Sequence, residues 1–218
     1  MTLKLVIGNK NYSSWSMRPW LALRASHIAF EEIFIPLYTG EADKKRILEF
    51  TRSGKVPALI DGDVTIWDSL AIIEYLAERF PETRLWPADR ARRAHARSIS
   101  AEMHSGFIAL RSECGMNLHR PVGAVALSDE ARADVARVQE IWTECRARHS
   151  DVGPFLFGSF SGADAMFAPV VHRFRTYAIP LPPLAQAYME TMMALPAFQE
   201  WTRAGLAETI VIEKFEQV

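Results

Sequence analysis

The first eighty residues alternate short apolar runs with segments in which apolar residues recur at helical spacing. The runs "LKLVI" at 3–7 and "EEIFIPL" at 31–37 are predicted strands, and "WLALRASHI" at 20–28 between them is a predicted helix. A strand, a helix and a second strand in this order predict a right-handed βαβ unit with parallel strands.

The pattern then continues with a weaker helix at 41–50, a hairpin and an amphipathic helix. The hairpin is predicted at 57–67, because Asp61 and Gly62 form a strong turn signal between two apolar runs. The helix is predicted at 69–80, where apolar residues fall on one face. The first part of the chain therefore has the order β-α-β-α-β-β-α.

The proline-bearing stretch at 81–91 breaks this alternation and is predicted to be a linker. After it the pattern is almost wholly helical, with Gly and Pro marking the turns. This composition shift predicts an α/β domain over 1–80 and an all-helical domain over 92–218. The helices are expected at 92–114, 128–148, 161–177, 183–194 and 196–206. "SGAD" at 161–164 matches a capping box, with Ser161 as N-cap and Asp164 as the N3 residue.

Composition removes several classes of function. The formal net charge of −1 gives no electrostatic reason to expect nucleic acid or an anionic membrane as a partner. No apolar run approaches ~18 residues, and the N-terminus lacks the features of a signal peptide. Cys114 and Cys145 lack a CxxC spacing, which fits a protein of the reducing cytoplasm. The six histidines show no paired ligand spacing, so we expect no metal site.

Several hydroxyl-bearing residues lie between the first predicted strand and the first predicted helix, in "NYSSWSMRPW". At such a junction the positive end of the helix and a hydroxyl donor can stabilise an anion. The alternative is that Ser13 and Ser14 only cap the helix. Pro19 has no N–H and fits the first turn best, so the sequence predicts Ser16 as the N-cap and Pro19 as the N3 residue.

Four stretches in the right order resemble the cytosolic glutathione S-transferases, with zeta-like bacterial members the most similar. "SSWSMRPWLAL" resembles the zeta-class serine-serine-cysteine motif, with Trp15 in place of the cysteine. "GKVPALIDGD" at 54–63 and "WDSLAIIEYLAERFP" at 67–81 are similar to the family's glutathione-binding core. "FSGADAMFAPVV" at 160–171 is similar to its central capping box. The resemblance implies a thioredoxin-like domain followed by a helical domain, usually in a homodimer.

The resemblance also implies glutathione as a co-substrate, bound on the first domain, and no metal. Ser13, with Ser14 beside it, would donate a hydroxyl to the glutathione thiolate. The family holds the proline of Val56–Pro57 cis, so that the Val56 backbone pairs with the peptide. Asp68 and Ser69 open a helix whose free N–H groups and hydroxyl would receive the γ-glutamyl carboxylate, or Asp68 could face the γ-glutamyl ammonium. The alternative is an N-cap, and both roles can hold together. Further candidate glutathione contacts are Trp15, Lys55 or Lys44 at the glycyl carboxylate, and Asn117.

A second, electrophilic substrate would lie between the two domains. The stretch 102–117 offers Met103, Phe107 and Arg111 at helical spacing, and the resemblance implies that one side of this helix faces the cleft. The alternative is that these residues belong to the hydrophobic core, which is the more common role of apolar residues at helical spacing. Arg111 would suit an anionic substrate.

The function expected from the resemblance is a cytoplasmic glutathione transferase of the detoxification type, acting on a small electrophile. A glutathione-dependent cis–trans isomerase of the maleylacetoacetate kind and a non-catalytic interaction module are the alternatives. The partners expected are glutathione, the electrophile and a second copy of the chain. Arginines near the start of the helix 92–114 lack partners nearby in sequence, and Glu74 and Glu78 are candidate partners across a two-fold interface. These arginines are Arg90, Arg92, Arg93 and Arg97.

Overall fold

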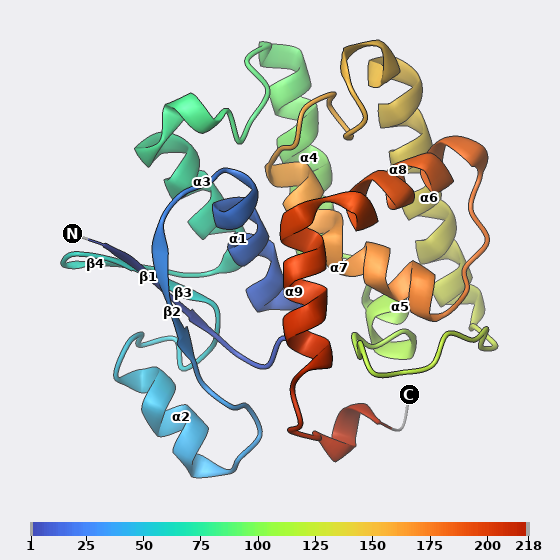
Figure 1. The fold of residues 1–218 in the computed structure, drawn as a ribbon. Coiled ribbons are helices and arrows are strands. Elements are labelled where there is room, and N and C mark those ends of the chain that lie inside the picture. The colour runs from blue at the N-terminus through green and yellow to red at the C-terminus, as the bar shows by residue number, and fades with distance from the viewer. Residues whose placement is uncertain (1, 217–218) are drawn as a thin grey trace.

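The computed structural model describes residues 2–216 and contains a mixed four-stranded sheet beside a group of helices (Figure 1). The sheet has the strand order β2-β1-β3-β4. β1 runs parallel to β2 and antiparallel to β3, and β3 and β4 form the expected hairpin. The strands are β1 (Leu3–Ile7), β2 (Phe30–Phe34), β3 (Ala58–Asp61) and β4 (Val64–Ile66).

From α4 onward the helices follow the sheet along the chain, and they occupy the centre and right of Figure 1. The helices packed on the sheet are α1 (Ser14–Ala25), α2 (Glu41–Leu48) and α3 (Ser69–Arg79). The remaining α-helices are α4 (Arg90–Ser105), α5 (Ile108–Glu113), α6 (Asp129–His149), α7 (Gly162–Thr176), α8 (Pro183–Ala194) and α9 (Pro196–Leu206). Short 3₁₀ helices are η1 (Pro81–Thr83), η2 (Ser150–Val152) and η3 (Glu213–Phe215).

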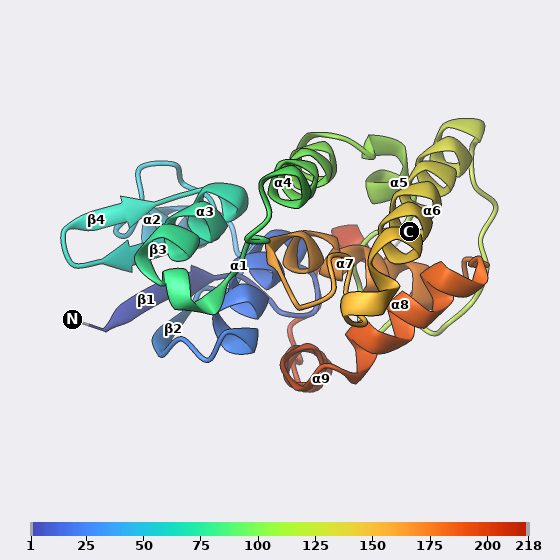
Figure 2. The ribbon, with the colours of Figure 1, turned by 90° about the horizontal axis from the view of Figure 1, so that it is seen from above.

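The alternation along β1 distributes its side chains between two cores. Leu5 and Ile7 join the large core formed with α1, α3 and the helical part, whereas Val6 joins a small core with Ile47 of α2. Successive side chains of a strand point to opposite faces, so α1 and α3 cover one face of the sheet and α2 covers the other. Figure 2 shows the helical part beside the α1 and α3 face. This arrangement confirms the expected fold class.

The central helix α7 starts with the expected capping box. Asp164 accepts hydrogen bonds from the backbone N–H groups of Ser161 at 2.8 Å and Leu156 at 3.0 Å, and Ser161 caps the helix in return. Burial raises the pKa of Asp164 to about 6, although these hydrogen bonds act in the opposite direction. Nearly the whole of α7 is buried, and it packs against α1. None of the helices within 2–216 is long and apolar enough to cross a bilayer.

The helix expected at 92–114 is interrupted. Gly106 ends α4, and Phe107 adopts a left-handed conformation with φ of 58° before α5 begins. A Cβ at Gly106 would lie 2.8 Å from the carbonyl oxygen of Glu102, so the glycine is needed for this close approach. Asp134 of α6 then accepts the N–H of Leu110 and holds the short α5 in place.

Two of the four arginines near the start of α4, Arg93 and Arg97, find partners in their own chain. Arg97 forms a two-point ion pair with Glu74 of α3, at 2.9 Å and 2.7 Å. Arg93 donates to the backbone carbonyl groups of Pro87 and Ala88. The expectation that Glu74 pairs with this cluster across a dimer interface is therefore wrong for Arg97, because α3 and α4 already lie side by side.

Candidate active site

Helix α1 begins three residues earlier along the chain than a Ser16 N-cap would place it. Ser13 is the N-cap, and its Oγ accepts the N–H of Ser16 at 3.3 Å and donates to Ser16 Oγ at 2.8 Å. Pro19 consequently lies inside the helix rather than in its first turn, where it leaves the carbonyl of Trp15 without the usual N–H partner. The expected N-cap at Ser16 was wrong because tertiary packing overrides the preference of proline for the first turn.

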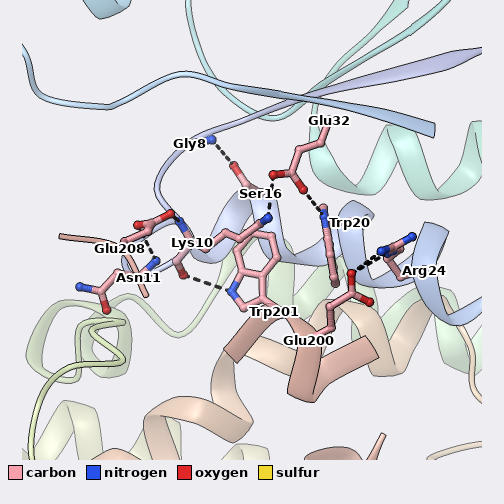
Figure 3. A network of polar contacts seen from close by, with 10 residues as sticks. All are labelled: Gly8, Lys10, Asn11, Ser16, Trp20, Arg24, Glu32, Glu200, Trp201 and Glu208. Atoms are coloured by element: carbon pink, nitrogen blue, oxygen red, sulfur yellow. Dashed lines mark hydrogen bonds and ion pairs between the residues drawn. The ribbon is translucent and has the colours of Figure 1, made fainter. Parts of the chain in front are cut away.

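The loop between β1 and α1 is fixed from several directions (Figure 3). Gly8 donates its N–H to Ser16 Oγ at 3.1 Å. The ammonium group of Lys10 pairs with Glu32 of β2 at 2.6 Å, and the indole N–H of Trp201 on α9 donates to the carbonyl of Lys10. The start of α1 is thereby held in one position by both the sheet and the helical part.

The start of α1 opens into a cavity of about 1100 Å³ between the sheet and the helical part. Both serines line it and are largely buried. The hydroxyl of Ser14 and the backbone N–H of Trp15 have no hydrogen-bond partner among residues 2–216. The other expected site residues that line the cavity are Trp15, Lys44, Lys55, Val56 and Arg111.

The Val56–Pro57 peptide bond is cis, as expected. Val56 lies at the cavity wall just before β3. Its backbone N–H and C=O have no partner within the described part of the chain, so both can pair with an extended peptide.

Asp68 and Ser69 lie at the start of α3, outside the cavity lining. Asp68 is the N-cap: its Oδ1 accepts the N–H groups of Leu70 and Ala71, and its Oδ2 lies 3.0 Å from His104 Nε2 of α4. The Oγ of Ser69 is buried without a hydrogen-bond partner within 2–216. The capping alternative for Asp68 is confirmed, and Ser69 supplies a hydroxyl with unused donor capacity.

Three arginines gather at the helical side of the cavity. Arg111 of α5 and Arg173 of α7 line the cavity, and the fully buried Arg18 of α1 lies beneath Trp15. The guanidinium carbons of Arg18 and Arg111 lie 4.4 Å and 4.5 Å from the centre of the Trp15 ring system. The rings of Trp15 and His104 also pack in a T-shaped arrangement, with their centres 5.3 Å apart.

These arginines have few anionic neighbours. Within residues 2–216 none of them forms a salt bridge, and Arg18 and Arg173 each have buried guanidinium nitrogens without a hydrogen-bond partner. Burial lowers the pKa of Arg18 to about 9, and the nearby charges of Arg111 and Arg173 act in the same direction. Burial also lowers the pKa of Arg173 to about 10 and that of Arg111. A bound anion would offset the free-energy cost of burying these charged guanidinium groups.

The sequence interpretation missed Arg18 and Arg173. Each lies in a helix of mostly buried residues, where an arginine breaks the apolar pattern. A buried arginine is almost always paired. This break in the pattern was the signal that could have identified them.

Several expected contacts lie elsewhere. Met103 and Phe107 are buried in the hydrophobic core and do not line the cavity, because α4 and the turn after it direct them toward the other helices. Asn117 is also buried, and its amide donates to the carbonyl of Phe215 and to the carboxylate of Glu216. Within residues 2–216 no group of three His, Cys, Asp or Glu side chains could hold a metal ion.

Comparison with known proteins places these features in a family. Sequence models of the glutathione S-transferase N-terminal and C-terminal domains match residues 12–79 and 125–204. Glutathione S-transferase Z1 of Arabidopsis thaliana is 31% identical over 205 residues, which cover 87% of this chain and 89% of that protein. A probable maleylacetoacetate isomerase of Caenorhabditis elegans is 32% identical over 190 residues, covering 85% and 87%.

Solved structures agree in fold. A glutathione transferase homologue from Burkholderia with bound glutathione has a TM-score of 0.72 at 24% identity, covering 95% of this chain and all of that one. A bacterial zeta-class maleyl pyruvate isomerase has a TM-score of 0.71 at 23% identity, covering 96% and 100%. Together with the sequence matches over both halves, these findings show that the chain belongs to the glutathione S-transferase family.

Proposed function

We propose that this protein is a glutathione transferase that activates the thiol of glutathione at the start of α1 for attack on a small electrophile. The observation that carries the proposal is the group of donors at one end of the cavity. The Ser13 and Ser14 hydroxyls and the Trp15 N–H meet there at the positive end of the helix. A free thiol has a pKa near ~8.5, so donors of this kind increase the fraction of thiolate at neutral pH.

The peptide would extend from this point in two directions. The unpaired backbone groups of Val56 suit the cysteinyl part of glutathione, and the unpartnered hydroxyl of Ser69 at the start of α3 suits the γ-glutamyl carboxylate. Ser13 already donates its proton to Ser16, whereas Ser14 has no acceptor in the described chain. Ser14 is therefore ready to donate to a thiolate, and Ser13 can do so by turning its hydroxyl away from Ser16.

The arginines favour an electrophile that carries a carboxylate. Arg111 and Arg173 line the same cavity as the serines, and no carboxylate of residues 2–216 pairs with them. A guanidinium binds a carboxylate in two-point geometry. This observation also supports the second candidate, a glutathione-dependent cis–trans isomerase, in which the thiolate adds to a conjugated double bond, the bond rotates and the thiolate leaves. Two relatives carry names of this activity.

A glutathione-dependent assay over aryl halides, peroxides and cis-enediones, each with and without a carboxylate, tests the proposal. We expect turnover that requires glutathione and is faster with the carboxylated member of each pair. Conversion of a cis-enedione to its trans isomer without consumption of glutathione would establish the isomerase. Absence of both turnover and glutathione binding would overturn the enzyme proposal and favour an interaction module.

We further propose that the protein acts in the cytoplasm as a homodimer. The support is the family resemblance, together with two half-exposed apolar side chains, Val64 and Trp67, at the edge strand β4 and just after it. An exposed apolar edge is a place where a second copy can pack.

A further inference from the structure

The last part of the chain returns to the loop that carries Ser13. After α9 the segment 207–216, which we term the tail, runs down to the lower edge of the molecule in Figure 1. The carboxylate of Glu208 accepts the backbone N–H groups of Lys10 at 2.6 Å and Asn11 at 3.2 Å (Figure 3). The tail is thus attached to the loop between β1 and α1.

Tyr12, the residue before Ser13, anchors the tail a second time. Its hydroxyl donates to Glu216 at 2.5 Å and accepts the N–H of Ile212 at 3.3 Å. The amide of Asn117 also donates to Glu216, at 3.0 Å. The bonds made by Tyr12 and Glu208 join positions about two hundred residues apart, and together with the Asn117 bond they fix the tail against the wall of the cavity.

The anchored tail brings Lys214 and Phe215 into the lining of the cavity. The ring of Phe215 lies 5.7 Å from that of Tyr12 and 5.2 Å from that of Tyr38, which follows β2. The ammonium group of Lys214 lies 5.3 Å from the centre of the Tyr38 ring. No carboxylate within the described residues forms a salt bridge with Lys214. The tail therefore presents a positioned cation that no carboxylate of residues 2–216 neutralises.

The direction of the bound peptide indicates which group this cation meets; this inference rests on the proposed binding of glutathione. The thiol belongs to the middle residue of the tripeptide, and the γ-glutamyl end is assigned to Ser69 of α3. In Figure 1, α3 lies in the upper part of the molecule, whereas α2 and the tail lie at its lower end. A glycyl carboxylate at the opposite end of the tripeptide from α3 would therefore lie on the side of the cavity lined by Tyr38, Lys44 and the tail. We propose that the ammonium group of Lys214 pairs with the glycyl carboxylate of glutathione, so that the tail forms part of the glutathione site.

Lys44 and Lys55 are the other cations at the cavity. Lys44 follows Asp43, whose carboxylate also lines the cavity and accepts the N–H groups of Tyr38 and Lys44. Within 2–216 neither Lys44 nor Lys55 lies over an aromatic ring. Of the three lysines, only Lys214 is held over such a ring. Its side chain is therefore already ordered, and it loses less conformational entropy when it forms an ion pair.

Binding of two ligands to Lys214→Gln tests the proposal. One ligand is glutathione, and the other is its monoester, in which the glycyl carboxylate carries an ethyl group. We expect Lys214→Gln to raise the dissociation constant of glutathione, measured by calorimetry, about three- to tenfold, and to leave that of the ester unchanged. Lys214→Arg should retain most of the affinity. Lys45→Gln, on α2 and outside the cavity lining, is the control and should affect neither ligand.

Three outcomes would overturn the assignment. Lys214→Gln could weaken both ligands equally, which would indicate a general effect of the tail. It could weaken neither. The loss specific to glutathione could instead occur in Lys44→Gln or Lys55→Gln. Failure of the wild-type protein to bind glutathione at all would overturn the proposed function itself, and the assignment of Lys214 with it.

Discussion

Replacement of Ser13 by alanine separates the chemical role of the first serine from its structural role. The hydroxyl takes part in two hydrogen bonds with Ser16 and also faces the cavity. Loss of the helix cap costs ~1 kcal/mol of stability. A hydrogen bond to a thiolate is worth ~1.5–3 kcal/mol, so its loss should slow the thiolate-limited step roughly 10–100-fold. The two losses are measured by different experiments.

Ser16→Ala is the matched control. Ser16 shares the hydrogen bond with Ser13 and accepts the N–H of Gly8, but it is fully buried and does not line the cavity. We expect Ser13→Ala and Ser16→Ala to lower the thermal midpoint by similar amounts. Only Ser13→Ala should then lower turnover per folded molecule and raise the apparent pKa in the pH–rate profile.

The measurement is kcat/KM for glutathione across pH at a saturating concentration of an aryl halide, together with the ultraviolet absorbance of the bound thiolate. Equal turnover and the same pH profile in Ser13→Ala and Ser16→Ala would refute the chemical role of Ser13. Loss of activity in Ser14→Ala alone would assign the donor to Ser14, whose hydroxyl has no hydrogen-bond partner among residues 2–216.

Three further predictions concern substrate charge, acid stability and assembly. Arg111→Gln should lower kcat/KM about tenfold for a carboxylated electrophile and little for an uncharged analogue, and equal losses would refute the anion role. The pKa of the fully buried His172 is lowered from 6.5 to about 3 by burial, so its stabilising contribution is complete above pH 6.5 and is lost as the pH falls toward 3. Urea unfolding should therefore show a loss of ~2 kcal/mol from pH 7 to pH 5 that His172→Gln lacks, and an identical loss in the variant would contradict it. Light scattering at micromolar concentration should give twice the chain mass, and a monomeric mass would exclude the homodimer.

The sequence predicted the elements whose signals are local. The alternation in β1, the Asp61–Gly62 turn and the capping box at Ser161 depend on neighbouring residues, and the structure contains each of them. The break after α4 was missed, because Phe107 takes up a left-handed conformation that its own residue type does not favour. The start of α1 was misplaced for a related reason, since packing holds Pro19 inside the helix.

The sequence predicted only part of the candidate site. Features contained in one short segment were predicted, whereas contacts between residues far apart in the sequence were missed. The two serines line the cavity, although one turn closer to the helix than expected, and the Val56–Pro57 bond is cis as expected. Each of these features is carried by one short segment. The tail was missed, because Tyr12 and Glu216 are joined by a hydrogen bond across almost the whole chain. Asn117 was expected to contact glutathione directly, but its amide holds the tail instead.

The substitution of Trp15 for the motif cysteine changes the charge environment of the cavity. A cysteine side chain could not present an aromatic face to Arg18 and Arg111, which both lie about 4.5 Å from the Trp15 ring system. Burial lowers the pKa of each of these arginines, so binding of an anion would favour their charged forms and raise those pKa values again. By linkage, the same charges lower the pKa of a nearby thiol and increase the affinity for a carboxylate. The positive charges of these arginines would therefore favour both the thiolate and an anionic electrophile. Arg111→Gln should accordingly shift the pH–rate profile as well as reduce the preference for carboxylates.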